Sequence, residues 1–528
     1  MKRNLHRLAS ETFDLLVIGG GINGVATAWD AAQRGLSVAL IEKDDYGAQA
    51  SAGCYRILHG GLRYLQHLDL GRVRESIAER RAMMRIAPHL NAPIGFLVPT
   101  YPGLMKGRAA MSAALAVNDL LSASRNRGIT DPSRHLPDGR TMGADEALRL
   151  CPAIPADGLT GAALFYDGMM MSCERLCALF ARAAAAAGAC CANHVEASSL
   201  ILEEGRAAGA EARDLLSGRR FAIRARVVAN VTGPWANRLV YPDRPFPKAF
   251  SAGLQIVTAP LFEISGLGVA FTSRQEDPDS RMSRGGRHLF AVPWRGRLTW
   301  GTTDTLYEGD PADWRITTRD IEAFVRELDA CLPGRGIDMG AVQHAFGGLR
   351  PVDERNLMTG SQVSRRYEIF DHANDPGIGN LFSMIGVKFT VGRSMAEKLV
   401  DLVFGKLGRK PPRCRTQTTP LPGGEFETFE KLVTLCRTAA PRGMTEPEIE
   451  ETARLYGSEA PAILSACRPT EDPFDRLGLI AARAAHGVKH EGAATVDDLV
   501  QRRLAPVVPG DALQWRAIAA QALDRAPA

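Results

Sequence analysis

Short apolar runs and an alanine-rich stretch follow one another near the amino terminus. Asp14–Ile18 is an acid followed by four apolar residues, which is typical of a buried parallel strand. Val25–Arg34 has the alanine-rich composition of a helix, and Ser37–Ile41 is a second short apolar run. A strand, a helix and a second strand in this order predict a βαβ unit, and therefore a protein of the α/β class.

The connection between the first strand and the helix contains a glycine motif. Gly19, Gly21 and Gly24 form the pattern G-x-G-x-x-G, and Glu42 follows the second strand. The first glycine permits a tight turn, the second lets a pyrophosphate approach the backbone, and the third allows close packing of helix and strand. The acid can accept hydrogen bonds from ribose hydroxyls. Because all these parts occur in order, we expect a Rossmann-like dinucleotide site that contains Gly19, Gly20, Gly21, Asn23, Gly24 and Glu42.

A later apolar strand pattern, Ala225–Val231, ends in Thr232-Gly233, as if it returned to the same nucleotide. A strand that ends in Thr-Gly recurs in FAD-binding domains of the two-dinucleotide class, so we expect FAD rather than NAD. Met171–Ala187 predicts a further helix, and Cys191–Val195 predicts a strand after it.

The composition is that of a globular protein. Hydrophobic residues make up 45% of the 528 residues and charged residues 23%, which excludes a disordered or fibrous chain. The net charge of +5, from 64 basic and 59 acidic residues, suits an anionic substrate or an acidic membrane surface but is too small to indicate nucleic acid. Ten cysteines without a C-x-x-C pair indicate free thiols in a reducing compartment and no metal site. With neither a spanning apolar stretch nor a secretory signal, we expect a cytoplasmic protein.

At about 150 residues per domain, a chain of this length predicts two to four structural units. The FAD-binding domain is expected to be discontinuous and to combine residues 12–90, 160–240 and 346–400. A substrate-binding domain around an antiparallel sheet would be formed by residues 91–159 and 241–345. Within it, His288–Trp294 and Arg297–Thr302 flank Arg295-Gly296 and predict a hairpin.

The character of the chain changes after about residue 404. Residues 405–424 are rich in Pro, Lys, Arg and Thr and indicate a linker. Helical patterns over 425–528 then predict a small helical domain. In its last pattern, Asp497-Asp498 and Arg502-Arg503 are expected to be charges on the surface of a helix.

Cys54–Gln66 contains the segment His-Gly-Gly-Leu-Arg-Tyr-Leu. Together with the nucleotide motif and Asn230–Trp235, it resembles the FAD-dependent glycerol-3-phosphate dehydrogenase family of the aerobic, quinone-linked type. Further resembling segments follow in the family's order, namely Phe165–Gly168, Glu174–Leu176, Pro293-Trp294, Gly301–Asp304, Gly348–Pro351, Gly386–Thr390 and Thr495–Arg503.

The resemblance implies a set of site residues. Arg63 would contact the substrate phosphate, and the basic residues of the later motifs would join it. The implied substrate-binding residues are Arg63, Tyr64, Gln255, Arg350 and Arg365, and the implied catalytic residues are His59, Lys388 and Arg350. The implied FAD contacts, beyond the glycine motif and Glu42, are Ser51, Arg56, Val195, Thr232, Gly233, Gly386, Lys388, Phe389 and Thr390.

These residue types suit the oxidation of a phosphorylated alcohol. Guanidinium groups hold a phosphate dianion well, a base such as His59 can take the hydroxyl proton, and a cation such as Lys388 can stabilise the developing negative oxygen. Taken singly, an arginine is more often a solvated surface charge, and a histidine is more often a hydrogen-bonded packing residue. Arg365-Arg366 in particular also fits an exposed loop pair.

The chain departs from the family at several positions. Relatives have a histidine, often treated as catalytic, where this chain has Gln255, and glutamine can orient an alcohol but cannot accept its proton. Cys54 and Tyr55 stand where relatives have small hydroxyl residues, and Gly386–Val391 also differs from the family pattern. The identity of the polyol and of the proton acceptor is therefore left open.

We therefore expect an FAD-dependent dehydrogenase that oxidises sn-glycerol 3-phosphate to dihydroxyacetone phosphate and passes the electrons to a quinone. Open alternatives are oxygen as the acceptor, another polyol phosphate such as erythritol phosphate, an amine or amino-acid oxidase on the same scaffold, and a flavin-binding protein that has lost its catalytic base. The expected partners are the polyol phosphate, the electron acceptor, the inner face of the plasma membrane as a peripheral contact, and a second copy in a homodimer.

Overall fold

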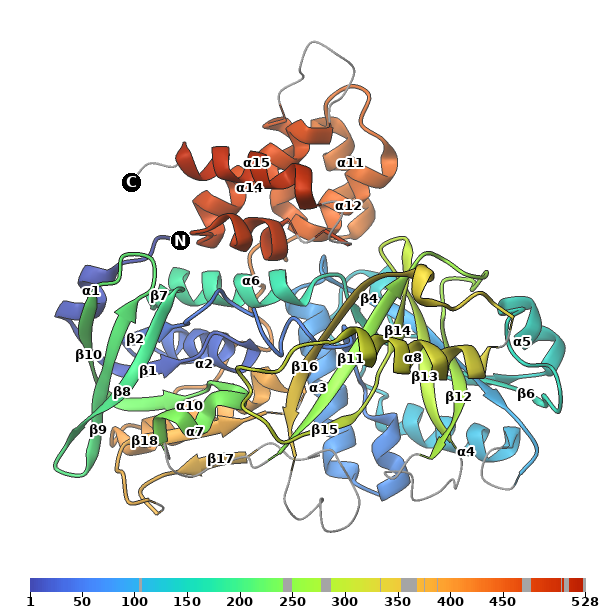
Figure 1. The fold of residues 1–528 in the computed structure, drawn as a ribbon, viewed down its shortest axis with the longest axis horizontal. Coiled ribbons are helices and arrows are strands. Elements are labelled where there is room, and N and C mark those ends of the chain that lie inside the picture. The colour runs from blue at the N-terminus through green and yellow to red at the C-terminus, as the bar shows by residue number, and fades with distance from the viewer. Residues whose placement is uncertain are drawn as a thin grey trace.

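Two sheets stand side by side, and a group of carboxy-terminal helices covers helix α6 (Cys173–Ala186) from above (Figure 1). The computed structural model describes residues 1–103, 107–240, 249–276, 286–332, 334–352, 368–374, 376–386, 388–467, 476–504, 506–507 and 512–525.

The first sheet contains the predicted βαβ unit and has eight strands in the described part of the chain. β1 (Thr12–Ile18) pairs in parallel with β2 (Val38–Ile41) and β10 (Arg220–Asn230), and α2 (Ile22–Gln33) connects β1 to β2. β7 (Cys190–Ala192) and β18 (Leu381–Ile385) extend the parallel sheet, and the antiparallel strands are β8 (Val195–Glu203), β9 (Arg206–Asp214) and β17 (Glu368–Asp371).

Strand β1 is buried on both faces, which explains its continuous apolar run. Leu15 and Val17 pack in the core that includes α2, α6 and α10 (Gly392–Lys406). Leu16 and Ile18 pack in a separate core with residues of β8, β9 and β10. A strand between two such layers cannot show the polar alternation of a half-exposed strand.

The second sheet is almost entirely antiparallel. Among the described residues its ten strands follow the order β15-β11-β14-β13-β12-β4-β6-β3, with β16 beside β11 and β5 beside β6, and only β12 and β4 pair in parallel. Phe324 and Leu328 of α8 (Thr318–Cys331) pack against this sheet in a core that contains Trp300. The strands are β3 (Ile57–Leu58), β4 (Asn91–Thr100), β5 (Arg140–Met142), β6 (Gly161–Met170), β11 (Phe250–Thr258), β12 (Gly268–Glu276), β13 (Gly286–Trp294), β14 (Arg297–Gly301), β15 (Thr305–Tyr307) and β16 (Val342–Pro351).

Several shorter elements connect or flank the two sheets. The 3-10 turn η1 (Leu62–His67) and helix α3 (Leu70–Ile86) follow β3, and α4 (Arg108–Leu121) follows β4. The others are α1 (Leu5–Ser10), η2 (Pro132–Arg134), α5 (Ala144–Leu150), η3 (Gly233–Trp235), α7 (Ala236–Val240) and η4 (Met339–Ala341).

The carboxy-terminal helices form the third layer in Figure 1. They are α11 (Phe429–Ala439), α12 (Glu446–Tyr456), η5 (Gly457–Glu459), α13 (Ala460–Ser465), α14 (Arg476–Glu491), the π-helical turn η6 (Asp498–Arg503) and α15 (Ala512–Asp524). The connection over 407–428 has no helix or strand but is well packed, since Leu421 is fully buried and its N–H donates to the Ile86 carbonyl at 2.8 Å.

The expected fold class is confirmed: an α/β nucleotide-binding region, an antiparallel substrate sheet and a carboxy-terminal helical region. The predicted hairpin is β13 and β14, with Pro293 close to the end of its strand. The proposed domain boundaries stay a prediction. β3 and β6 lie inside the ranges assigned to the FAD domain and β16 crosses the boundary at residue 346, but all three strands pair in the second sheet.

One sequence-based expectation about the helical domain is wrong. Asp498 and Arg503 are fully buried and Arg502 is nearly so, whereas we expected surface charges; of the four residues, only Asp497 is exposed as expected. Two of their partners, Asp45 and His194, lie more than 300 positions earlier in the chain, which a local helical pattern cannot show.

No helix within the described ranges is long and apolar enough to cross a membrane. The ten cysteines are free thiols. Within the same ranges, no group of three or more His, Cys, Asp or Glu side chains is arranged as a metal site.

Candidate functional site

The glycine turn between β1 and α2 has the geometry that the motif predicts. Gly19 has a φ of +111°, and a Cβ there would lie 2.6 Å from the Val231 carbonyl oxygen. A Cβ on Gly24 would lie 1.8 Å from the Gly19 carbonyl oxygen. Gly21 differs, because a Cβ there would meet only Ser51 Oγ, at 3.2 Å. The first and third glycines are thus required by the fold, and the second keeps space open beside the helix.

Glu42 is fixed at the end of β2. Its carboxylate accepts hydrogen bonds from the backbone N–H groups of Gly20 at 2.5 Å and Asp44 at 2.8 Å. Burial raises the pKa of Glu42, and these two hydrogen bonds oppose that rise. The carboxylate is therefore held at the glycine turn, where it can also accept hydrogen bonds from a ribose.

A single large cavity of about 1670 Å³ extends from this turn into the second sheet. Gly20 and Gly24 pack behind the turn and do not line it. The expected site residues that line it are spread between positions 19 and 390: Gly19, Gly21, Asn23, Glu42, Ser51, Arg56, His59, Tyr64, Val195, Thr232, Gly233, Gln255, Arg350, Gly386, Lys388, Phe389 and Thr390.

Arg56 lies deep in the wall of the cavity. Its guanidinium makes two hydrogen bonds to the Glu174 carboxylate, at 2.7 and 2.9 Å, and is stacked between the rings of Trp294 and Phe346. Burial alone would raise the pKa of Glu174, but the charge and hydrogen bonds of Arg56, together with the hydrogen bond from Ser172, lower the value to about 2. Arg56 therefore connects the cavity wall to the start of α6.

His59 lies at the end of β3, with its side chain half exposed in the cavity. Its Nδ1 is 3.9 Å from Asp167 Oδ2, and Asp167 also accepts a hydrogen bond from the Gly60 N–H at 2.7 Å and pairs with Arg80. Asp167 is buried and lines the cavity. An imidazole beside a fixed carboxylate is an arrangement that can accept a proton.

Lys388 also lines the cavity, and its Nζ lies 3.9 Å from the centre of the Tyr64 ring. Burial lowers the pKa of Lys388 to about 8, although the Asp167 charge acts in the opposite direction. An ammonium group with a pKa near neutrality can stabilise a developing negative charge and can also exchange a proton.

Arg350 reaches the cavity from β16. Its Nη2 donates to Ser251 Oγ at 3.0 Å and lies 3.6 Å from Asp304 Oδ1, and Ser251 in turn donates to Asp304. The side chain is about one third exposed. Its position on the rim is suited to an anionic group of a substrate.

Gln255 is buried beneath the same region. Its amide oxygen accepts from Thr302 Oγ1 at 2.7 Å, while the amide nitrogen donates to the carbonyl oxygens of Gly53 and Phe346, each at 3.1 Å. The amide is thus engaged by the protein on both sides, although the residue lines the cavity.

Two expected site residues lie outside what the structure describes. Arg365 falls within the undescribed residues 353–367, and the side chain of Arg63 in η1 is likewise not described. Their assignment to the substrate phosphate stays a prediction.

Sequence reasoning missed Asp167 as a site residue. It lies inside Phe165–Gly168, one of the segments that resembles the family, but the segment shows no local sign that its acid faces His59. The pairing of β6 with β3 brings the two side chains together, and that pairing joins strands about 110 positions apart.

The cavity fits an FAD molecule. It exceeds the roughly 300–1,000 Å³ of a pocket for a drug-sized ligand. At one end it offers the open space beside Gly21, the start of α2 and the Glu42 carboxylate, which suit a pyrophosphate and a ribose. At the other end, Phe389, Thr390 and His59 line the cavity, and the backbone N–H of His59 donates to Thr390 Oγ1 at 3.3 Å.

Comparison with protein families agrees with this geometry. Residues 14–402 match the family of FAD dependent oxidoreductases, and residues 414–519 match the C-terminal domain of alpha-glycerophosphate oxidase. The first match spans more than half of the chain and identifies the dinucleotide as FAD.

Individual relatives match over nearly the whole chain. A glycerol-3-phosphate dehydrogenase from Synechocystis sp. is 31% identical, over 95% of this chain and 90% of that protein. An aerobic glycerol-3-phosphate dehydrogenase from Bacillus subtilis is 29% identical, over 95% and 88%.

Solved structures show the same fold. The glycerol-3-phosphate dehydrogenase from Bacillus halodurans, in complex with FAD, superposes with a TM-score of 0.74 at 24% identity and covers 98% of this chain and 92% of that one. Glycine oxidase from Geobacillus kaustophilus gives a TM-score of 0.52 at 21% identity over 78% of this chain and 99% of that one.

Proposed function

The chain belongs to the FAD-dependent glycerol-3-phosphate dehydrogenase family, and from this premise we propose that it oxidises sn-glycerol 3-phosphate to dihydroxyacetone phosphate. The observation that carries the proposal is the meeting of His59, Asp167, Lys388 and Arg350 in the cavity that also contains the glycine turn. When bound, FAD supplies the acceptor for the hydride that leaves the secondary carbon of the substrate.

The residues at the substrate end of the cavity have three different roles in the proposed reaction. His59, oriented by Asp167, accepts the proton of the substrate hydroxyl. The Lys388 ammonium stabilises the negative charge that builds up on that oxygen. Arg350 binds the phosphate, and Arg63 and Arg365 are the further phosphate ligands expected from the sequence.

The electron acceptor in this proposal is a quinone. Part of the cavity wall is apolar and is formed by η1 and α4, through Leu65, Leu68, Met111 and Val117. Leu68 is 83% exposed and Leu120, at the end of α4, is 79% exposed. This apolar rim supports both the entry of an apolar acceptor and a peripheral contact with the inner face of the plasma membrane. The expected homodimer stays a prediction.

Flavin bleaching without oxygen tests the proposal. Purified holoenzyme is mixed anaerobically with sn-glycerol 3-phosphate, erythritol 4-phosphate, sarcosine or a D-amino acid, and absorbance near the flavin maximum is followed. We expect rapid bleaching with sn-glycerol 3-phosphate. Faster bleaching with erythritol 4-phosphate would move the substrate to another polyol phosphate, and bleaching by the amines alone would contradict the proposal. Reoxidation by a soluble quinone compared with oxygen then distinguishes a dehydrogenase from an oxidase.

A further inference from the structure

The carboxy-terminal helical domain reaches the back of the FAD site. We call residues 42–45, which follow β2, the ribose loop. Asp45 at its end is fully buried and accepts hydrogen bonds from both terminal nitrogens of Arg503, at 2.7 and 2.8 Å, and from Arg502 Nε at 2.6 Å. Both arginines belong to η6, more than 450 positions later in the chain. The segment that carries Glu42 is therefore fixed from outside the nucleotide-binding region.

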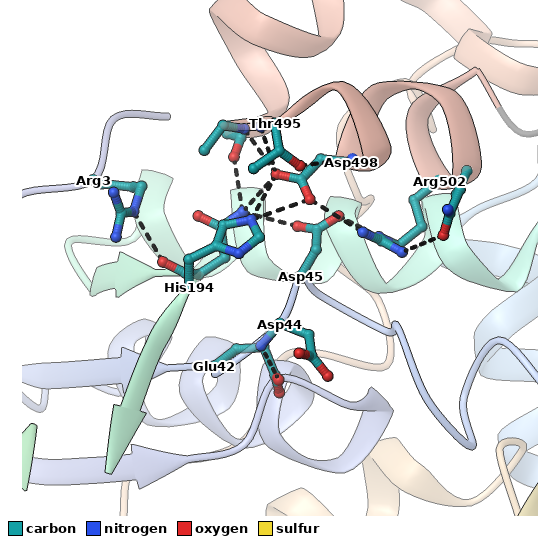
Figure 2. A network of polar contacts seen from close by, with 12 residues as sticks. Arg3, Glu42, Asp44, Asp45, His194, Thr495, Asp498 and Arg502 are labelled. Atoms are coloured by element: carbon teal, nitrogen blue, oxygen red, sulfur yellow. Dashed lines mark hydrogen bonds and ion pairs between the residues drawn. The ribbon is translucent and has the colours of Figure 1, made fainter. Parts of the chain in front are cut away.

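A second contact involves His194. Figure 2 shows Asp498 of η6 directed toward His194 and Asp45, with Glu42 and Asp44 on the side away from η6. The His194 Nε2 lies 2.9 and 3.1 Å from the two Asp498 oxygens. His194 has a φ of +55°, in the left-handed region that non-glycine residues rarely adopt. Such a backbone persists only where its surroundings hold it. Here the backbone of His194 is hydrogen-bonded to Asp44 and Leu215, and its side chain is held by Asp498.

The ribose loop and the segment at His194 form one unit. The Glu42 carbonyl accepts from the Val195 N–H at 2.8 Å, and the His194 N–H donates to the Asp44 carbonyl at 2.8 Å. The Asn193 side chain donates to Asp45 Oδ1 at 2.9 Å. Both sides of this unit line the FAD cavity, through Glu42 and through Val195. A displacement of Asp45 or His194 is thus transmitted to both cavity-lining residues.

Residues in and just before η6 hold Asp498 in position for its contact with His194. Asp498 accepts from the N–H groups of Ala494 at 2.9 Å and Thr495 at 3.1 Å, and it pairs with Arg502 at 3.1 Å. Burial would raise the pKa of Asp498, but the hydrogen bond and charge of His194 and the nearby cations hold it well below its usual range. These residues lie in Thr495–Arg503, the family-like segment that the proposed reaction leaves without a role.

Other ion pairs also attach this domain, but they do not touch the ribose loop. Arg182 of α6 makes two hydrogen bonds to Glu459 at 2.5 and 2.7 Å, and Arg175 pairs with Glu491. These pairs contact α6, outside the unit formed by residues 42–45 and 193–195. Arg175 also donates to the Arg503 carbonyl at 2.8 Å, so the Arg182–Glu459 pair is the natural comparison for a contact that only holds two domains together.

We propose that Asp498, Arg502 and Arg503 are positioning residues for FAD, and that FAD binding and docking of the carboxy-terminal domain stabilise each other. The domain orders the ribose loop and His194 in the geometry that presents Glu42 and Val195 to the adenosine half of the cofactor. Because coupling between two binding events is reciprocal, bound FAD in turn strengthens the docking. The proposal depends on FAD as the cofactor and is independent of which alcohol is oxidised.

The test is an FAD titration of deflavinated full-length protein, in the absence of substrate. For Arg503→Met we expect the Kd for FAD to rise about 10-fold, within the usual range of coupling between sites. The KM for sn-glycerol 3-phosphate and kcat, measured at saturating FAD, should stay within about twofold, because η6 does not line the substrate end. Bound FAD should raise the melting temperature of wild type by more than that of the variant.

Arg182→Met is the matched control. It removes a similar two-bond contact between the same two domains, so it should lower the melting temperature and leave the Kd for FAD unchanged. If Arg503→Met lowers the melting temperature but leaves the Kd for FAD unchanged, or if both variants weaken FAD equally, η6 only holds the domains together and the proposal is overturned.

His194→Asn keeps the test valid if Arg503→Met does not fold. Asparagine tolerates the left-handed backbone but cannot reproduce both contacts of the imidazole with Asp498. We expect the Kd for FAD to rise about fivefold. An unchanged Kd in this folded variant would overturn the proposal, whatever the outcome of substrate assays.

Discussion

The two ends of the cavity are built in different ways. At the adenosine end, much of the shape comes from the backbone of one continuous stretch, in which the glycine turn and Glu42 lie within 24 residues, and Val195, Thr232 and Gly233 add to the cavity wall. At the substrate end, the contacts are charged side chains from β3, β6, β16 and the segment before α10, namely His59, Asp167, Arg350 and Lys388.

The difference predicts how each end responds to mutation. The glycine turn has no side chain to remove, so it fails when atoms are added. A charge-shaped site keeps its shape when a side chain is shortened but loses transition-state stabilisation. Substitutions at the first end should therefore act on cofactor binding, and substitutions at the second should act on turnover.

The largest effect is expected for Gly21→Val. The new Cβ would meet only Ser51 Oγ, at 3.2 Å, but the added side chain fills the space available to a pyrophosphate. The variant should fold and purify without FAD, which absorbance spectra and circular dichroism would show. Gly24→Ala is the contrasting variant, because its Cβ would collide with the Gly19 carbonyl and should prevent folding. A yellow Gly21→Val protein would contradict the assignment of the turn.

Lys388→Met should leave FAD bound but lower the limiting rate of flavin reduction about 10²- to 10³-fold, the loss typical of removing a group that stabilises a developing negative oxygen. Its aliphatic side chain still packs on the Tyr64 ring. The measurement is the rate of anaerobic flavin reduction at saturating sn-glycerol 3-phosphate. Lys388→Arg is the control, since it keeps the positive charge, and it should recover part of the rate. A Met variant that reduces its flavin at the wild-type rate would remove Lys388 from the chemistry.

The sequence alone predicted the adenosine end of the cavity better than the substrate end. The βαβ unit, the glycine turn and Glu42 follow from contiguous residues whose roles are set by local backbone geometry, and the structure has them where the sequence predicts them. Asp167 was missed because β-strand pairing, rather than sequence proximity, brings it to His59.

Asp498 and Arg503 show the limit more clearly. Charged residues at helical spacing are usually solvated, and nothing near them in the sequence indicates that His194 is a partner of Asp498 or that Asp45 is the partner of Arg503. Their burial depends on domain docking, which only the three-dimensional structure reveals. Only their place in a segment that resembles the family hinted at a role.

The pH dependence of kcat/KM should sharpen the role of Asp167. If charged Lys388 is the active form, kcat/KM falls as pH rises through about 8, since the ammonium is lost above its pKa. The Asp167 charge raises that pKa, so Asp167→Asn should move the alkaline limb to lower pH. In Lys388→Arg the limb should disappear, because arginine stays protonated. An alkaline limb that keeps its position in Asp167→Asn would show that Lys388 does not sense this carboxylate.

The smallest effect on activity is expected at Gln255, although the sequence pointed to it as a substrate ligand. Its amide is already held by Thr302, Gly53 and Phe346, so Gln255→Leu removes protein contacts and should lower the free energy of unfolding by about 1–3 kcal/mol. The KM for sn-glycerol 3-phosphate should change less than about threefold, because the substitution removes no contact with the bound substrate. Thermal unfolding and steady-state kinetics separate the two effects. A KM that rises more than about 10-fold with unchanged stability would show that the Gln255 side chain binds the substrate and does not have the structural role that we infer.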